Sequence, residues 1–213
     1  MKNMYKYHMP EVRIKDAWLL RSNASKHLHE LWSKDGEVLA DDDKMHEIVE
    51  AYKKAWQPYE RNVLQAMYDL LELRFYQNTI DVYIAPWFHA FSDPMVIGVT
   101  YGPDRFVEIL THELCHRLLT DNQYNTGYPI LGNEWVRLCG EDISFVTRVH
   151  IPVHATLQAI FNDVLLEPER TKNDKKLCKQ WPDYDAAWKY VDRHGYKTII
   201  RQLKASYKTL EEK

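Results

Sequence analysis

The sequence has little cysteine and no long apolar segment. Its three cysteines, at positions 115, 139 and 178, are widely spaced and form no CxxC pair. This usage argues against a disulfide framework and favours a reducing compartment. The first 16 residues, MKNMYKYHMPEVRIKD, lack the continuous apolar core of a signal peptide, and no apolar run approaches the length of a membrane-spanning helix. We therefore expect a cytoplasmic protein with no membrane partner.

A strong excess of charge of either sign is also missing. The formal net charge is −3, from 28 basic and 31 acidic residues. A helix predicted near 196–207 has a basic face with Lys197, Arg201 and Lys204, but such a face is usually just solvated. The balanced charge therefore speaks against nucleic acid as a partner.

What the chain does have is enough apolar sequence for a core. Hydrophobic residues make up 45% of 213 residues, so no disulfide staples are needed. We expect an N-terminal helical extension and loop over 1–43, a main domain over 44–170, and a C-terminal helical extension over 171–213 that packs on it as one compact unit.

The order of predicted elements indicates an α+β fold. Apolar residues at three- and four-residue steps predict helices over 45–56 and 59–75. Alternating, β-branched segments then predict strands over 79–85 and 95–101. Pro103 can open a helix over 104–120, and further helices are expected over 133–138, 151–166, with Pro152 near its start, and 196–207. A small sheet with a central helix and surrounding helices is the predicted architecture.

The helix predicted over 104–120 contains the sequence His112-Glu113-Leu114-Cys115-His116, an HExxH motif. Residues four apart lie on one face of a helix, so both imidazoles can face one metal ion. Glu113, one position along, can reach a metal-bound water without ligating the metal. It would then act as a general base. His112 and His116 are thus predicted zinc ligands, with one zinc per chain, and Glu113 is the predicted catalytic residue.

The segment 95–120 resembles the zincin metallopeptidases, in which an edge-type strand precedes the active-site helix. The resemblance implies that His112 and His116 bind zinc, that Glu113 is the general base, and that 96–101 is the strand with which substrate backbone pairs. Cys115 falls at a variable position of the motif, where a packing role is expected.

A catalytic zinc needs a third protein ligand, and the sequence offers more than one. His150 and His154 are four residues apart at the start of the helix predicted over 151–166, so they could share one of its faces. Either can ligate the metal while the other supports it. Glu134 follows Asn133 much as the third ligand of thermolysin-like zincins does, at a slightly short spacing. A SprT-like arrangement is disfavoured because Leu131 stands where those proteases have a histidine.

These observations predict a zinc-dependent hydrolase that cuts a peptide or protein substrate. The alternative is a zincin-fold metal-binding or regulatory protein without turnover. A helical nucleic-acid-binding protein is the third reading, and the balanced charge disfavours it.

Overall fold

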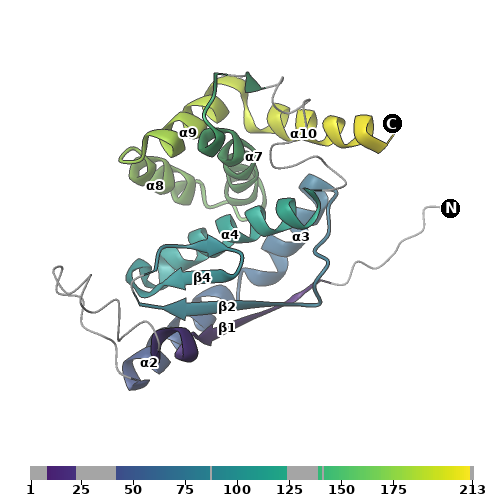
Figure 1. Ribbon diagram of the computed structural model, residues 1–213. Helices are drawn as coiled ribbons and strands as arrows, with labels where there is room; N and C mark the ends of the chain where they lie inside the picture. Colours follow the sequence, from purple (N-terminus) through teal and green to yellow (C-terminus); the bar gives the residue numbers. More distant parts are fainter. Residues whose placement is uncertain (1–8, 23–41, 87, 124–138, 141, 212–213) are drawn as a thin grey trace. The chain divides into compact units, whose positions relative to one another are not determined.

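The computed structural model describes the chain over most of its length (Figure 1). The described residues are 9–22, 42–86, 88–123, 139–140 and 142–211. The chain divides into two compact units. We call Pro10–Glu60 with Gln77–Glu113 the sheet unit, and Met1–Met9, Arg61–Tyr76 and Leu114–Lys213 the helical unit.

The sheet unit is built on a four-stranded mixed sheet in the order β1-β2-β4-β3. Strand β1 (Glu11–Asp16) and β4 (Met95–Gly98) both run parallel to β2 (Thr79–Ala85), and these three lie side by side in Figure 1. The short β3 (Phe91–Ser92) pairs with β4 in the antiparallel direction. Central β2 matches its predicted bounds, because its alternating β-branched pattern suits a half-buried strand.

Three expectations about the sheet unit are wrong. The N-terminal region was predicted to be helical, but Glu11–Asp16 form β1, whose Ile14 faces the core. The strand before the motif helix is not an edge strand throughout, because Met95 and Val96 pair with β3. It also ends early: β4 stops at Gly98, and Val99–Tyr101 form a 3-10 turn, η2.

Helix α2 (Asp42–Trp56) packs against β1, and its Tyr52 side chain contacts the end of β4. The Tyr52 ring stacks on Phe106 with ring centroids 4.1 Å apart. Its hydroxyl donates to the carbonyl oxygens of Gly98 and Val99, at 3.3 and 3.1 Å. These carbonyls belong to the short segment that leads into the motif helix. The Tyr52 hydrogen bonds therefore help α2 to fix the position at which that helix begins.

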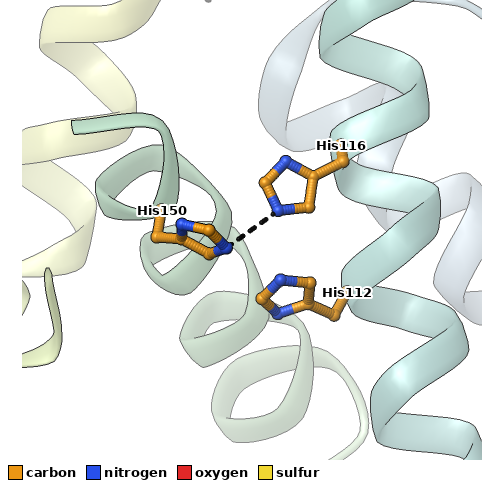
Figure 2. Close-up of side chains that lie close together, drawn as sticks. All are labelled: His112, His116 and His150. Atoms are coloured by element: carbon orange, nitrogen blue, oxygen red, sulfur yellow. Dashed lines mark hydrogen bonds between the residues drawn. The ribbon is translucent and has the colours of Figure 1, made fainter. Parts of the chain in front are cut away.

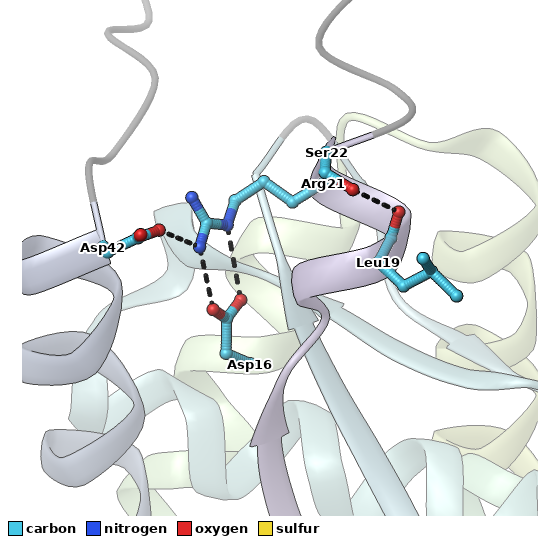
Figure 3. A network of polar contacts seen from close by, with 5 residues as sticks. All are labelled: Asp16, Leu19, Arg21, Ser22 and Asp42. Atoms are coloured by element: carbon cyan, nitrogen blue, oxygen red, sulfur yellow. Dashed lines mark hydrogen bonds and ion pairs between the residues drawn. The ribbon is translucent and has the colours of Figure 1, made fainter.

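In the sheet unit, Arg21 forms ion pairs with two aspartates near the end of β1 (Figure 3). The Arg21 guanidinium bonds the Asp16 carboxylate at 2.9 Å and the Asp42 carboxylate at 2.6 Å. The Asp16 bond is the largest cause of a raised pKa at Arg21. These ion pairs therefore link the end of β1 to the first turn of α2. The negative charge of Asp42 also interacts favourably with the positive end of the α2 helix dipole.

The motif helix, α4 (Gly102–Asp121), spans both units, whose boundary falls between Glu113 and Leu114. Gly102 has φ 72°, a conformation that favours glycine, and Pro103 follows in the first turn. The buried face includes residues from one end of the helix to the other: Phe106, Val107, Leu110, Leu114, Leu118 and Leu119.

In the rest of the helical unit, the regular secondary structure of the described residues is helical. The helices are α3 (Glu60–Leu71), whose first residue belongs to the sheet unit, α7 (Phe145–Ala159), the π-helix η3 (Ile160–Val164), α8 (Pro168–Cys178), α9 (Pro182–His194) and α10 (Tyr196–Glu211). Helix α7 packs against both α9 and α10. Its central position explains why nearly all its side chains after Arg148 are buried.

Helix α7 starts six residues earlier than predicted, so Pro152 lies inside the helix and not near its start. The cause is Ser144, whose Oγ accepts a hydrogen bond from the Thr147 N–H at 3.1 Å and caps the helix. Helix α3 ends at Leu71, four residues earlier than predicted, where Glu72 takes a left-handed conformation with φ 56°.

The α+β class is confirmed by this mixture of a small sheet and many helices. Within the described residues, no helix is both long and apolar enough to cross a membrane. The predicted division at 43 and 170 stays a prediction, and the helix expected over 133–138 lies outside the described residues.

We predict that Ser144→Ala lowers the free energy of unfolding by about 1–2 kcal/mol, because the α7 cap is lost. Ser144→Thr keeps the capping oxygen and should retain most of the stability. Urea unfolding of both variants measures the difference. Equal losses in the two variants, or none in Ser144→Ala, would contradict a capping role.

Candidate metal centre

The motif residues are held by a single continuous helix. His112, Glu113 and His116 all lie on α4, with the two imidazoles one turn apart. Although the unit boundary crosses this helix, the spacing of the two histidines is a property of the helix itself. Cys115 is fully buried as a reduced thiol, in keeping with the expected packing role.

His116 meets His150 inside the helical unit (Figure 2). Their Nε2 atoms lie 3.2 Å apart, and the rings meet edge to face. His150 Nδ1 lies 2.7 Å from the carbonyl oxygen of Val146, one turn earlier on α7. Since a carbonyl oxygen only accepts, Nδ1 must carry the proton. The Nε2 atom of neutral His150 therefore presents its lone pair toward His116.

This geometry fits two ligands of one tetrahedral ion. With Zn–N distances of about 2.0–2.1 Å, two donors of a tetrahedral zinc lie about 3.3 Å apart. The observed separation of 3.2 Å is close to that value. His112 lies on the same helix as His116. One ring nitrogen from each of the three histidines lies within 4.8 Å of the others. The three imidazoles thus form a possible metal-binding group.

The surroundings keep two of these imidazoles, those of His116 and His150, neutral. Burial, together with a smaller effect of His150, lowers the pKa of His116 to about 3. Burial also lowers the pKa of His150 to about 4, against the opposing effects of the Val146 hydrogen bond and the Asp183 charge. Because a metal ion binds the neutral ring, no proton has to leave these two side chains at pH 7.

Glu113 is deeply buried, with 8% of its surface exposed. Burial raises its pKa to about 8, so the carboxyl group holds a proton at neutral pH when no cation is near. A nearby divalent cation favours the charged form of a carboxylate. The ionisation state of Glu113 is thus coupled to metal binding.

Two tyrosines near this centre were not found by sequence reasoning. Tyr184, on α9, lies with its ring centroid 4.1 Å from that of His150. Tyr101, at the end of η2, has a raised pKa, mainly through burial and partly through the charge of Glu113. Neither stands in a motif, and Tyr184 comes from a helix whose position no local pattern reveals.

Of the candidates for the third ligand, His150 lies beside the motif histidines, whereas His154 lies in a different group of potential ligands. His154 is fully buried, its ring stacks on Trp188, and its ligand atoms group with those of Asp174 and Cys178. Glu134 and Leu131 lie outside the described residues, so the Glu134 alternative stays a prediction.

Comparisons with known proteins add no relative, since no family model, curated protein or solved structure matches the chain. Any functional conclusion must therefore come from the residues and their geometry.

We predict that the metal-free protein loses stability as the pH falls from about 6.5 towards 4. An unfolded histidine takes up its proton near pH 6.5, whereas folded His150 does so only at about pH 4. The unfolded state thus binds more protons in this window, and stability is fully present only above it. At about 1.4 kcal/mol per pKa unit, His150 contributes a loss of about 3 kcal/mol.

Denaturant unfolding at several pH values, after chelation and dialysis, measures the slope. Carboxylates titrate in the same range, so His150→Gln serves as the control and should show a shallower dependence. Identical slopes in the two proteins would count against a buried neutral His150.

Proposed function

We propose that the chain is a zinc-dependent hydrolase of the zincin type, acting on peptide bonds. The observation that carries the proposal is the convergence of His150 Nε2 on the HExxH histidines, at 3.2 Å from His116 Nε2. A lone HExxH motif can arise by chance in a helix. A third imidazole with its lone pair aimed at the motif supplies what a chance occurrence lacks.

The donor set favours zinc over the hard cations. Three neutral imidazoles suit zinc, whereas calcium and magnesium prefer oxygen ligands. Three protein ligands also leave a coordination position for chemistry, as in catalytic zinc sites. When bound, zinc supplies Lewis-acid polarisation and makes water more acidic.

Glu113 supplies the base in this proposal. It is adjacent to His112 on α4 and is not counted among the metal-binding group. Its carboxylate takes a proton from the attacking water and passes it to the leaving amine. Burial serves this role because a poorly solvated carboxylate is a stronger base than an exposed one.

The substrate class rests on the resemblance of the motif helix and its preceding strand to zincin peptidases. In the structure Met95 and Val96 already pair with β3, while Ile97 and Gly98 pair with β2 alone. Only the end of β4 nearer the motif helix thus has a side without a strand partner among the described residues. The Gly98 carbonyl there already accepts a hydrogen bond from Tyr52, and Ile97 is fully buried, so pairing of substrate with 96–101 stays an expectation of the resemblance.

A metal-binding protein without turnover is the second candidate. The deep burial of Glu113 favours it, because a carboxyl group with 8% of its surface exposed is poorly accessible to an attacking water and a substrate. The two candidates differ in whether Glu113 matters once the metal is bound.

We expect Glu113→Gln to retain zinc but to lower peptide hydrolysis by about 10²–10⁴-fold, the usual contribution of a general base. Cleavage of a quenched-fluorescent peptide library by the zinc-loaded chain measures this effect. Glu108→Gln is a matched control, since Glu108 is equally buried on α4 and pairs with Arg105. Turnover unchanged in Glu113→Gln, or absent from the wild type, would leave the non-catalytic candidate.

The third ligand has its own test. His150→Ala should weaken zinc binding at the HExxH pair by more than about 100-fold, because loss of a mere supporting group already costs 10–100-fold. Competition with a chromophoric chelator measures the affinity. Glu134→Gln should leave the affinity unchanged. The reverse pattern would assign the third position to Glu134.

A further inference from the structure

A second group of potential ligands lies in the helical unit, outside the HExxH centre. His154 is on α7, while Asp174 and Cys178 are on α8, four residues and one helical turn apart. One ligand atom from each lies within 4.8 Å of the others. We propose that His154, Asp174 and Cys178 form a second metal site, for a thiophilic divalent cation such as zinc.

The carboxylate of this group is directed inward. Asp174 Oδ2 accepts two hydrogen bonds, one from the Cys178 thiol at 3.5 Å and one from the Trp188 indole N–H at 3.0 Å. A cation that replaces the thiol proton would find the sulfur and the carboxylate oxygen already facing each other. The Trp188 bond would then hold the carboxylate in place, as supporting hydrogen bonds do in known metal sites.

Trp188 also orients the imidazole. The His154 ring stacks on the indole with centroids 4.3 Å apart and planes 11° apart. One side chain of α9 thus fixes two of the three ligands, which come from α7 and α8. A bound ion would join these two helices where α9 already packs against them.

Charge and burial suit a divalent ion. His154 is fully buried, and Cys178 and Trp188 are 4% and 2% exposed. A thiolate and a carboxylate together balance a double positive charge, which offsets the cost of placing an ion away from water. The Lys175 ammonium, 4.9 Å from the Trp188 ring centroid, would oppose the ion, but it pairs with the Asp192 carboxylate.

The donor set separates this site from the first. A sulfur, an imidazole and a carboxylate favour zinc over calcium or magnesium, which take oxygen ligands. His150 and His154 are one turn apart on α7, so the helix would contribute one ligand to each centre. The site needs no hydrolytic activity, and it stands whether or not the proposed enzyme function is correct.

Cobalt substitution of the full chain tests the proposal, because only a thiolate ligand gives cobalt a sulfur-to-metal charge-transfer band. We expect this band in the wild type and in His116→Ala. We also expect its loss in Cys178→Ser and its weakening in Asp174→Asn. Cys139→Ser is the matched control, since Cys139 is also a buried, reduced thiol of the helical unit, and it should keep the band.

Zinc content measured by elemental analysis supplies a second readout. The wild type should bind about two zinc ions, and Cys178→Ser about one, with the HExxH ion retained. Circular dichroism of each variant shows whether it is folded. Absence of the band in the wild type, its survival in Cys178→Ser, or a zinc content unchanged by Cys178→Ser would overturn the second site. Loss of peptide hydrolysis alone would not affect it.

Discussion

The hydrogen bond from His150 Nδ1 to the Val146 carbonyl is the interaction on which the candidate centre depends. It fixes the tautomer of the ring, so that Nε2 offers a lone pair to His116 Nε2 at 3.2 Å. Without it the ring could adopt the other tautomer, in which Nε2 carries the proton and cannot bind a metal ion. The acceptor comes from the first turns of α7, and that part of the helix exists because Ser144 caps it. A local capping residue thus supports the chemistry one turn further along.

Burial has opposite effects on the ionisable groups of the centre. It lowers the pKa values of His116 and His150 and raises that of Glu113, because a poorly solvated site disfavours charge of either sign. Without a cation, these three side chains are therefore neutral at pH 7. A cation that bound here would not first have to displace an ionising proton from His116 or His150. In the proposed function, Glu113 would gain its charge, and with it its basicity, when the cation is present.

Helix α7 connects the two groups of ligands. Its histidines at successive turns face different neighbours: His150 lies against His116, and His154 lies against Trp188 and α8. Tyr184 is near both rings. An ion in the second group would restrain α7 one turn away from His150. Its effect on the first centre would be to hold His150 in place, which is a positioning role and not a chemical one.

Features that depend on short-range spacing could be predicted from the sequence alone. The HExxH pair, the helix that holds it, the β2 strand and the α+β class follow from periodicities of 3.6 and 2. Which of His150 and His154 lies beside the motif depended on tertiary packing, because residues one turn apart share a face and differ only in what packs against them. The tertiary structure likewise added β1, which pairs with a strand more than sixty residues away, and the group of His154 with Asp174 and Cys178. Such long-range contacts leave no periodic trace in the chain.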